Sequence, residues 1–374
     1  MLGGQLAALF SERNQCNMCF RLILLFMLTT FAAYVGADGL RPYIVVQSIA
    51  YSEPFAIKFM LNKQQAPFNG GSKAFTYNKV ETGFQWGNWQ LGVLERLDYQ
   101  LEFSSETAEL IYLAENRLPP ERDREYELRI KAKHNYSRGL RLAYQHRFSS
   151  WLDIGMAASY LQGKAFTDGT VQGRAEITAD NNYNFQFDAD YFYSRDVLFE
   201  RDVESPDGNG FSLDFRLDWR PSEYFTVQLD VVDLVGRMFW ENAPFTTAVA
   251  LSDTRTLDEE GYVRYNPVIE GTESSKSFTQ ILQRKIFVAA KYQLLPSFGL
   301  LAELQDYDIV QFTSVGAEWC YSSHSCFQAL HNTTIDALSM RYQGRRIRIE
   351  LASDKKDLDQ ARYVVVQLSL HQVF

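Results

Sequence analysis

The sequence lacks the long apolar runs of a helical membrane protein and the cysteines of a disulfide-rich scaffold. After Ala37, no apolar run approaches the roughly 20 residues that a membrane-spanning helix needs. Only 4 of the 374 residues are cysteine, which excludes a fold held mainly by disulfides. The formal charge of −9 argues against nucleic acid as a partner, because phosphate binding requires a basic surface.

Catalytic and metal-binding motifs are also lacking. No phosphate-binding loop, HExxH motif or CxxC pair follows Ala37. The acidic residues Asp180, Asp188 and Asp190 do not have the spacing of a calcium-binding loop. His324 lies between two serines, but in a segment expected to be a loop, where a positioned catalytic triad is not expected. The sequence therefore predicts no enzyme activity, no cofactor and no metal site.

The N-terminus has the order of a secretory signal peptide. Arg13 and Arg21 precede an apolar run from Leu22 to Ala33, and small residues follow at Val35–Ala37. The alternative is a membrane anchor, but the run is shorter than the roughly 20 residues that a helical span needs. We expect residues 1–37 to be a removable signal and residues 38–374 to be the exported domain.

Two cysteines remain after such a cleavage. Cys320 and Cys326 lie close together in a chain that is predicted to leave the cytoplasm. An oxidising compartment favours a disulfide between them. The alternative is a pair of unpaired cysteines in a loop.

Alternation of apolar and polar residues recurs along the whole exported part. In Phe211–Trp219, every odd residue is apolar and every even residue is polar. Successive side chains of a strand point to opposite faces, so this pattern predicts a strand with one apolar and one charged face. The same pattern recurs at Tyr183–Tyr193, Phe225–Val231 and Arg346–Leu351.

Two kinds of connection separate these predicted strands. Four are tight and rich in Gly, Pro, Asn or Ser, with aromatic residues beside several of them: Trp86–Trp89, Phe148–Trp151, Arg220–Glu223 and Leu295–Ser297. Three are predicted to be long and polar: Ser194–Gly208, Glu241–Ser277 and Cys320–Thr333. Tight turns at one end and long loops at the other are typical of outer-membrane barrels.

One stretch predicts a tall hairpin. Apolar alternation runs from Trp89 to Phe103 and returns from Tyr126 to Phe148, with a tip at Glu115–Arg124. Both arms exceed the roughly 9–11 residues of a tilted transmembrane strand, so the hairpin is expected to project from the bilayer. Glu95 falls on the apolar face of the first arm. A charge facing lipid is costly, which predicts a bulge, an interfacial depth or a different register there.

The last residues carry a resemblance to a known superfamily. Val364, Val366, Leu368, Leu370 and Phe374 share one face, and Gln367, Ser369 and His371 share the other. A closing strand that ends in Phe resembles the end of bacterial outer-membrane β-barrel proteins, including porin-like ones. The sequence departs from that pattern at Gln372, where an apolar residue is more typical. The resemblance implies insertion into outer-membrane lipid, with Phe374 as a signal to the barrel-assembly machinery.

These patterns predict an all-β fold, a transmembrane antiparallel up-and-down barrel. A sheet in lipid must close, because an open edge leaves backbone groups unsatisfied. The expected number is about 14 strands, within about 12 to 16, starting near Phe55–Leu61. A soluble sandwich also gives alternation, but it does not account for the signal, the aromatic strand ends and the final Phe.

Parity places a nearly balanced set of charges inside the barrel. They either line a water-filled path or pair across the lumen and fill it. The first reading predicts a porin-like channel for small polar solutes or a saccharide. The second leaves a non-transporting surface, assembly or secretion-system component that uses the tall hairpin. The predicted lumen residues are Arg96, Asp98, Arg141, Arg147, Asp188, Asp190, Asp214, Arg216, Asp218, Lys285, Lys291, Arg346 and Arg348.

Overall fold

The computed structural model describes residues 39–62, 67–177, 183–196, 201–252, 255–257, 263–265 and 268–371. The predicted signal peptide, Gln372 and Phe374 lie outside these residues. Within them, no helix has the length and apolar character of a transmembrane span.

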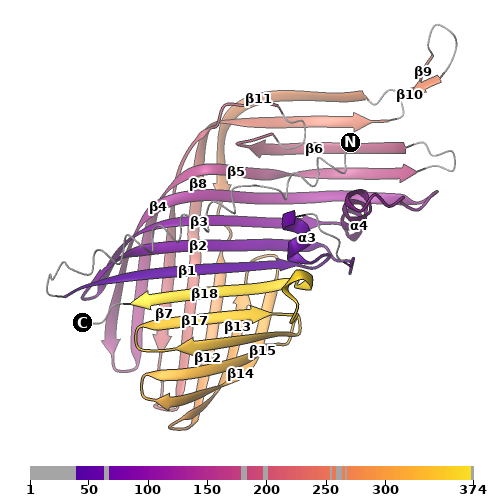
Figure 1. Cartoon of the computed structure of the whole chain (residues 1–374). Coiled ribbons are helices and arrows are strands. Elements are labelled where there is room, and N and C mark those ends of the chain that lie inside the picture. Colours follow the sequence, from indigo (N-terminus) through magenta and orange to yellow (C-terminus); the bar gives the residue numbers. More distant parts are fainter. Residues whose placement is uncertain are drawn as a thin grey trace.

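Sixteen strands form one antiparallel sheet, and its ends meet (Figure 1). Strand β18 pairs with β1 from Tyr43 opposite His371 to Tyr51 opposite Tyr363, which closes the sheet. The bounds are β1 (Leu40–Ser52), β2 (Lys73–Trp86), β3 (Trp89–Phe103), β4 (Glu125–Ser149), β5 (Leu152–Ile177), β6 (Tyr183–Tyr193), β7 (Asp207–Trp219), β8 (Phe225–Leu251), β11 (Val268–Ile281), β12 (Lys285–Leu295), β13 (Phe298–Asp306), β14 (Gln311–Ser322), β15 (Ser325–Asn332), β16 (Ala337–Gln343), β17 (Ile347–Ser353) and β18 (Tyr363–His371).

The closed barrel has 14 strands because two positions around it are each filled by two strands. Both β6 and β7 lie between β5 and β8, one after the other. Similarly, β11 and β12 follow one another along β8. The predicted antiparallel barrel of about 14 strands is therefore confirmed. The remaining elements are a small hairpin of β9 (Arg255–Leu257) and β10 (Val263–Tyr265), helices α3 (Ile57–Asn62) and α4 (Ser105–Glu115), and a short 3-10 helix, Leu358–Gln360.

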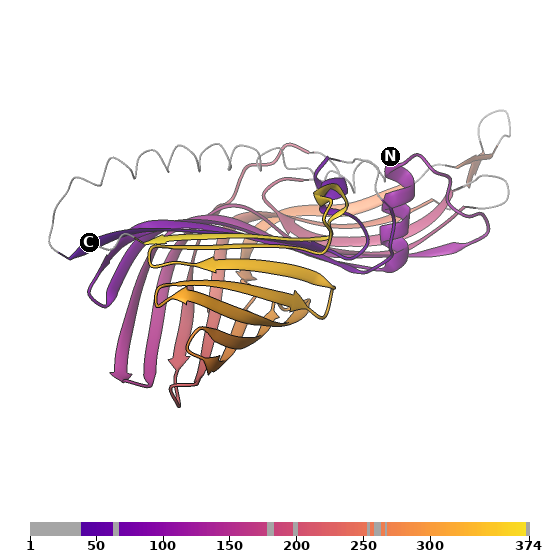
Figure 2. The same cartoon turned by 60° about the horizontal axis from the view of Figure 1, so that its bottom comes forward.

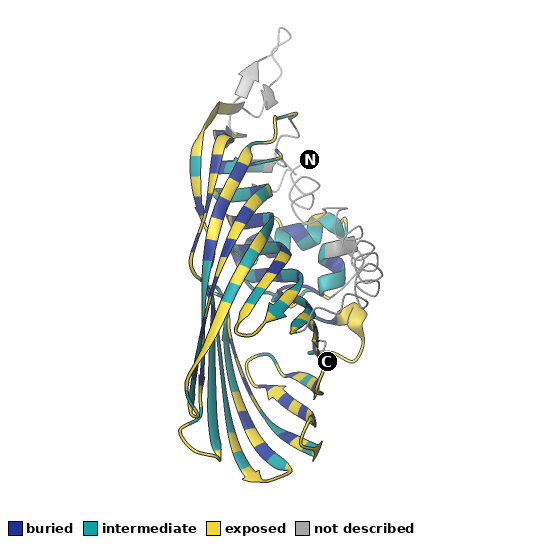
Figure 3. Ribbon diagram, turned by 90° about the vertical axis from the view of Figure 1, so that its left-hand side faces the viewer, coloured by how far each residue is buried: buried dark blue, intermediate teal, exposed yellow. Residues whose placement is uncertain are grey.

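One wall of the barrel is much taller than the other. Strands β4, β5 and β8 have 25, 26 and 27 residues, whereas β16 and β17 have 7 each. The turns Trp86–Trp89, Phe148–Trp151, Arg220–Glu223 and Leu295–Ser297 lie at one end of the barrel, which is called the tight-turn end. At the opposite loop end, part of the sheet rises past the rim (Figures 2 and 3). This projecting wall consists of residues 125–137, 163–177, 183–193, 237–251 and 268–281. Its 13 residues of β4 correspond to about 43 Å at roughly 3.3 Å per residue.

The outer face carries an apolar band whose upper limit is a row of polar residues. Glu95, Arg138, Gln162 and Asn209 lie side by side on β3, β4, β5 and β7. Below that row, the outer faces of β4, β5 and β7 are apolar over about nine residues, the length of a membrane-crossing strand. Exposed aromatic residues ring the tight-turn end, as at a membrane interface: Trp86, Trp89, Tyr144, Phe148, Trp151, Trp219, Tyr224, Tyr292, Trp319 and Tyr321.

Glu95 therefore lies at the edge of the apolar band. Its strand pairs with β2 and β4 without a register shift. The Arg138 guanidinium lies 3.2 Å from the Glu95 carboxylate. The Tyr136 hydroxyl donates a hydrogen bond to the same carboxylate. Of the three predicted explanations, the interfacial depth is the one that the structure supports.

A second layer covers the outer face of the projecting wall. Phe55 and Phe59 of the α3 region and Ile111 of α4 pack on Leu101 and Ile130 of the sheet. Farther along, Tyr191 and Tyr193 of β6 pack with Val203 of the connection to β7. The outer apolar stripe thus faces protein above the band and the membrane below it.

The predicted first strand at Phe55–Leu61 is wrong. The first strand is Leu40–Ser52, and Ile57–Asn62 is helical. Phe55 and Phe59 are four residues apart, so on a helical turn they lie on the same side. This side packs on Ala74 and Leu101, so the apolar residues here follow a helical period rather than a strand period.

Two predicted long loops are also wrong. Glu241–Ser277 belongs mainly to β8 and β11, and Cys320–Thr333 contains all of β15 and the end of β14. In β15 the polar residues Gln328 and Asn332 are buried on the inner face, so its polar character belongs to a strand rather than to a loop. The connection Ser194–Gly208 does contain a non-strand segment, and β7 starts at Asp207. The tall hairpin is confirmed, with α4 inserted before its tip.

Candidate functional site in the barrel lumen

An aromatic plug fills one side of the lumen near the loop end. It is formed by Tyr51, Phe75, Tyr307, Phe312 and Tyr363, all buried. Tyr307 comes from the β13–β14 connection and stacks on Phe75 with 4.6 Å between ring centroids. The side-chain amide of Gln100, on β3, donates a 2.9 Å hydrogen bond to the Tyr307 carbonyl. The plug therefore joins opposite walls of the barrel.

A second apolar cluster fills the other side. Trp240 of β8 stacks on Phe166 of β5 at 4.2 Å and packs with Leu94 of β3. Two glycines provide the space for its indole. A Cβ atom at Gly163 or Gly208 would come within 2.3 or 2.4 Å of the Trp240 ring.

A polar seam runs between the two clusters. Its centre consists of Arg96 on β3, Asp98 on the same strand, Asp233 on β8 and Lys285 on β12. The two terminal guanidinium nitrogens of Arg96 lie 2.8 and 2.7 Å from the two carboxylate oxygens of Asp233. The Lys285 ammonium lies 3.3 Å from Asp233, 3.4 Å from Asp98 and 4.6 Å from the centre of the Tyr77 ring.

Several buried polar atoms of this seam have no hydrogen-bond partner among the described residues. They lie on neighbouring inner-face positions of β2, β3 and β4. Four of the side chains are held by another of their atoms, as when Asn135 donates to Gln280 at 3.0 Å. Leaving a buried polar group unpaired costs about 1–3 kcal/mol. The atoms are Tyr77 Oη, Arg96 Nε, Asp98 Oδ1, Gln100 Oε1, Asn135 Oδ1 and Ser137 Oγ.

Toward the tight-turn end, the charges become more accessible. Arg141 lies 3.5 Å from Glu81 and 3.1 Å from Asp214. Arg216 lies 3.5 Å from Asp230, and these two side chains are 45% and 39% exposed. This half of the lumen is therefore a charged vestibule that water reaches, while the seam above it is closed.

A separate charge cluster lies on the short side of the barrel. Arg341 of β16 contacts Glu303 at 2.7 Å and Glu350 at 2.9 Å. Lys291 of β12 pairs with Glu318 of β14. Acids and bases thus neutralise one another across several strands rather than forming a region of one sign.

The structure places most of the predicted lumen residues on the inner face, but not all within the lumen. Asp188 and Asp190 lie on β6, in the projecting wall, because β6 continues the line of β7 past the rim. Arg346 lies between β16 and β17 at the tight-turn end. Arg147 contacts Asp153 at 3.0 Å, with its side chain 73% exposed. The inner-face set within the barrel is Arg96, Asp98, Arg141, Asp214, Arg216, Asp218, Lys285, Lys291 and Arg348.

Sequence reasoning missed Asp233, Glu81, Glu318 and Arg341. Asp233 is hidden because β7 and β8 change register between Leu213 and Phe215, which interrupts the alternation. Its φ of 56° is a left-handed conformation that aspartate tolerates better than most residues. The interruption Val231-Val232-Asp233 in an alternating strand was the available signal.

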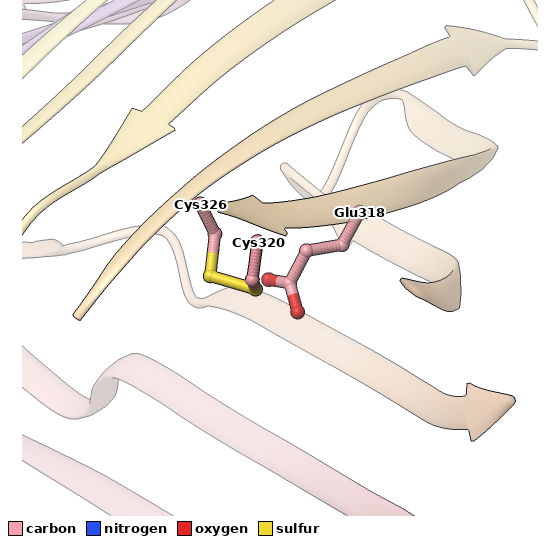
Figure 4. A group of neighbouring side chains, drawn as sticks. All are labelled: Glu318, Cys320 and Cys326. Atoms are coloured by element: carbon pink, nitrogen blue, oxygen red, sulfur yellow. A yellow bond between two sulfur atoms is a disulfide. The ribbon is translucent and has the colours of Figure 1, made fainter. Parts of the chain in front are cut away.

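The predicted disulfide is confirmed, although not in a long loop. Cys320 and Cys326 face each other across the β14–β15 hairpin and are bonded, beside Glu318 (Figure 4). Glu318 accepts a 2.6 Å hydrogen bond from Gln328 and pairs with Lys291. Because the two sulfurs are bonded to each other, these three residues do not form a metal site.

Comparison with known proteins identifies a family but no activity. Residues 27–344 match the family described as "Family of unknown function (DUF5723)". No curated protein matches the chain.

Similarity to solved structures is weak. The CymD monoaromatic hydrocarbon channel is 9% identical, with a TM-score of 0.38 and 90% of this chain and 89% of that chain covered. A Pseudomonas aeruginosa FadL homologue is 10% identical, with a TM-score of 0.38 and coverages of 89% and 88%. The translocator domain of the autotransporter NalP from Neisseria meningitidis is 9% identical, with a TM-score of 0.26 and coverages of 96% and 98%. These scores carry no argument about mechanism or ligand.

Proposed function

The chain belongs to the DUF5723 family, and we propose that it is a gated channel for small polar solutes in the bacterial outer membrane. The polar seam around Arg96 and Asp233 is its closed gate. The closed barrel, the apolar band and the aromatic ring support the membrane location, because this combination is typical of outer-membrane barrels. The short turns of such barrels face the periplasm, so the vestibule opens there and the projecting wall lies outside the cell.

The unpaired polar atoms of the seam carry this proposal. An interior that served only as filling would be better stabilised by apolar side chains, because a partly satisfied buried network is costly. Opening the seam would let water reach the six unpaired atoms and recover part of the roughly 1–3 kcal/mol that each costs. The closed state is therefore opposed by its own buried polar groups, as a gate requires.

The size of the seam favours small solutes over a saccharide. The plug and the Trp240 cluster occupy both sides of the lumen, and only the seam between them is polar. Acids and bases alternate along this route, so weak ion selectivity is expected. The proposal includes export by residues 1–37, assembly through Phe374 and no catalysis.

Single-channel recording of the purified full-length protein in planar bilayers tests the gate. We expect rare, salt-dependent openings for the native protein and at least tenfold higher open probability for Asp233→Asn. The control is Asp359→Asn, which alters an exposed pair with Lys58 far from the seam and should leave the recordings unchanged. Folded barrels are verified by their shifted gel mobility before boiling. Silence of both the native protein and Asp233→Asn at high protein load would overturn the proposal.

The projecting wall supports a second role as a surface component. A channel does not require a sheet in which β4 continues past the rim for 13 residues, about 43 Å measured along the strand. This extension corresponds to the tall hairpin, for which the sequence predicts a role as a surface, assembly or secretion-system component.

A further inference from the structure

The projecting wall has two lateral edges, and one of them is capped by α4. Where β4 continues past β3, the Ser104 amide donates to the Arg129 carbonyl at 3.0 Å. The Arg129 amide donates to the Thr107 hydroxyl at 2.9 Å, and the Ser104 hydroxyl donates to the Glu127 carbonyl at 2.6 Å. The Glu127 amide donates to Glu106. The backbone groups of this edge therefore have partners.

The opposite edge is β11, and it has no such cover. From Val268 opposite Leu251 to Ile281 opposite Arg237, β11 pairs with β8. Across the ranges that the structure describes, no strand pairs with its other side and no side chain bonds its backbone there. The adjacent position is open because β13 ends at Asp306, where the chain turns Tyr307 into the plug.

Two of the usual protections against strand addition, a proline and a covering element, are missing from residues 270–277 among the described residues. Glu270 and Lys276 do place charges on the inner face of this edge. Natural edge strands are blocked by proline, bulges, inward charges or a covering element. Residues 270–277 are exposed and contain no proline. The single register shift, between Lys276 and Phe278, lies near the rim and leaves the segment above it regular.

We propose that the β11 edge binds an extended segment of another protein, which adds to the projecting wall as a further strand. Strand addition uses the regularly spaced backbone donors and acceptors of a free edge. Two barrels inserted in the same direction would bring their β11 strands together in parallel, because β11 continues the membrane-crossing β12 along β8. Parallel pairing is slightly less stable per residue than antiparallel pairing, and a segment of another protein is free to add antiparallel. We therefore assign the edge to a different chain on the loop-end side.

The side chains beside the edge define the chemistry of this segment. Glu270, Thr272 and Ser274 share the exposed inner face of β11. Glu273, on the outer face, already pairs with Arg201. The structure therefore favours a segment with hydroxyl-bearing or β-branched residues and a basic residue opposite Glu270. This site is far along the wall from the seam and does not depend on channel activity.

Photo-crosslinking in the native membrane tests this inference with the full-length protein. A photoreactive amino acid is placed at Thr272 or at Ser274, and the adducts are mapped by mass spectrometry. We expect both positions to label one segment of one other protein, at residues two apart. The control position is Arg129 on the capped edge, which should not label that segment. Adducts confined to lipid, to this chain or to scattered sites would overturn the proposal, and adducts to a second copy would replace it with self-association.

Two adjacent proline variants separate edge binding from folding. Proline has no backbone N–H, and the N–H groups of successive strand residues point to opposite edges. Of Thr272→Pro and Glu273→Pro, one variant therefore loses a hydrogen bond to β8. The other loses only a donor on the free edge. The variant that keeps the folded gel mobility should lose at least 80% of the adducts formed from Ser274. Unchanged adducts in that variant would contradict the proposal. Channel recordings of the same variant should match the native protein, so the failure of either proposal is recognised separately.

Discussion

Arg96 and Asp233 are 137 positions apart in the sequence, yet they form two parallel hydrogen bonds of 2.8 and 2.7 Å inside the barrel. Both side chains are buried, and the pair connects β3 to β8 across the lumen. A buried ion pair is strongly sensitive to loss of one partner, because the other charge is then left without compensation.

Asp233→Asn should therefore lower the free energy of unfolding by about 3 kcal/mol. The control variant, Asp359→Asn, removes a solvent-exposed ion pair and should lower the free energy of unfolding by less than about 1 kcal/mol. Urea unfolding in detergent, followed by gel mobility, measures both. Equal losses for the two variants would show that the seam does not stabilise the barrel.

Gly163 and Gly208 should not tolerate alanine. A Cβ atom at either position would come within 2.3–2.4 Å of the buried Trp240 ring. We expect each variant to lower the free energy of unfolding by about 1–3 kcal/mol, the usual cost of overpacking. Gly155→Ala is the matched control, because its Cβ would have no neighbour closer than 3.4 Å. Intrinsic tryptophan fluorescence during urea unfolding gives the values, and a tolerated Gly208→Ala would contradict the observed packing.

The apolar band predicts different costs for two outward positions on β4. Leu142 lies inside the band, and Arg138 lies at its polar edge. Leu142→Arg should destabilise the barrel by about 2–4 kcal/mol in lipid vesicles, while Arg138→Leu should cost less than about 1 kcal/mol. Folding titrations in vesicles measure the difference. A low cost for Leu142→Arg would place the membrane at another height.

The Cys320–Cys326 disulfide closes a short loop at the tight-turn end. The double variant Cys320→Ser/Cys326→Ser should lower the free energy of unfolding by about 2 kcal/mol, mainly through the unfolded state. Reducing agent should lower the stability of the native protein by a similar amount and leave the double variant unchanged. The prediction fails if reduction acts equally on both.

Asp168, on the inner face of the projecting wall, provides a pH prediction. Burial raises the pKa of its carboxyl above the ordinary value, despite the opposing charge of Lys133. A raised pKa in the folded state means that its stabilising effect is full below the unfolded pKa, about 3.9, and is lost as the pH rises through the folded pKa. The stability of the native protein relative to Asp168→Asn should therefore fall as the pH rises above about 4. Unfolding of both proteins across a pH series measures this difference in stability. A difference that rises with pH would contradict the prediction.

Sequence alternation was sufficient to predict the barrel because a membrane-crossing strand must present alternate residues to lipid and lumen. Phe211–Trp219 shows this directly, since its odd residues face outward and its even residues point inward. The tight aromatic turns and the disulfide are equally local, because each depends on residues close in the chain.

The partners of the lumen charges could not be derived in the same way. Parity placed Arg96 on the inner face, but not opposite Asp233, which lies at a register shift on a strand far along the sequence. The height of the wall was also hidden. Alternation persists along β4 and β8 whether the apolar face meets lipid or a layer such as α4, so the pattern does not mark where the membrane ends.

The sequence by itself determined the strand faces, the antiparallel barrel and its approximate size, because these follow from the two-residue period of a strand in lipid. Only the tertiary structure decided that the lumen is closed at the polar seam, that one wall projects, and that β11 keeps a free edge. These features depend on which distant strands meet and where one strand ends beside another, and closure of the barrel fixes both.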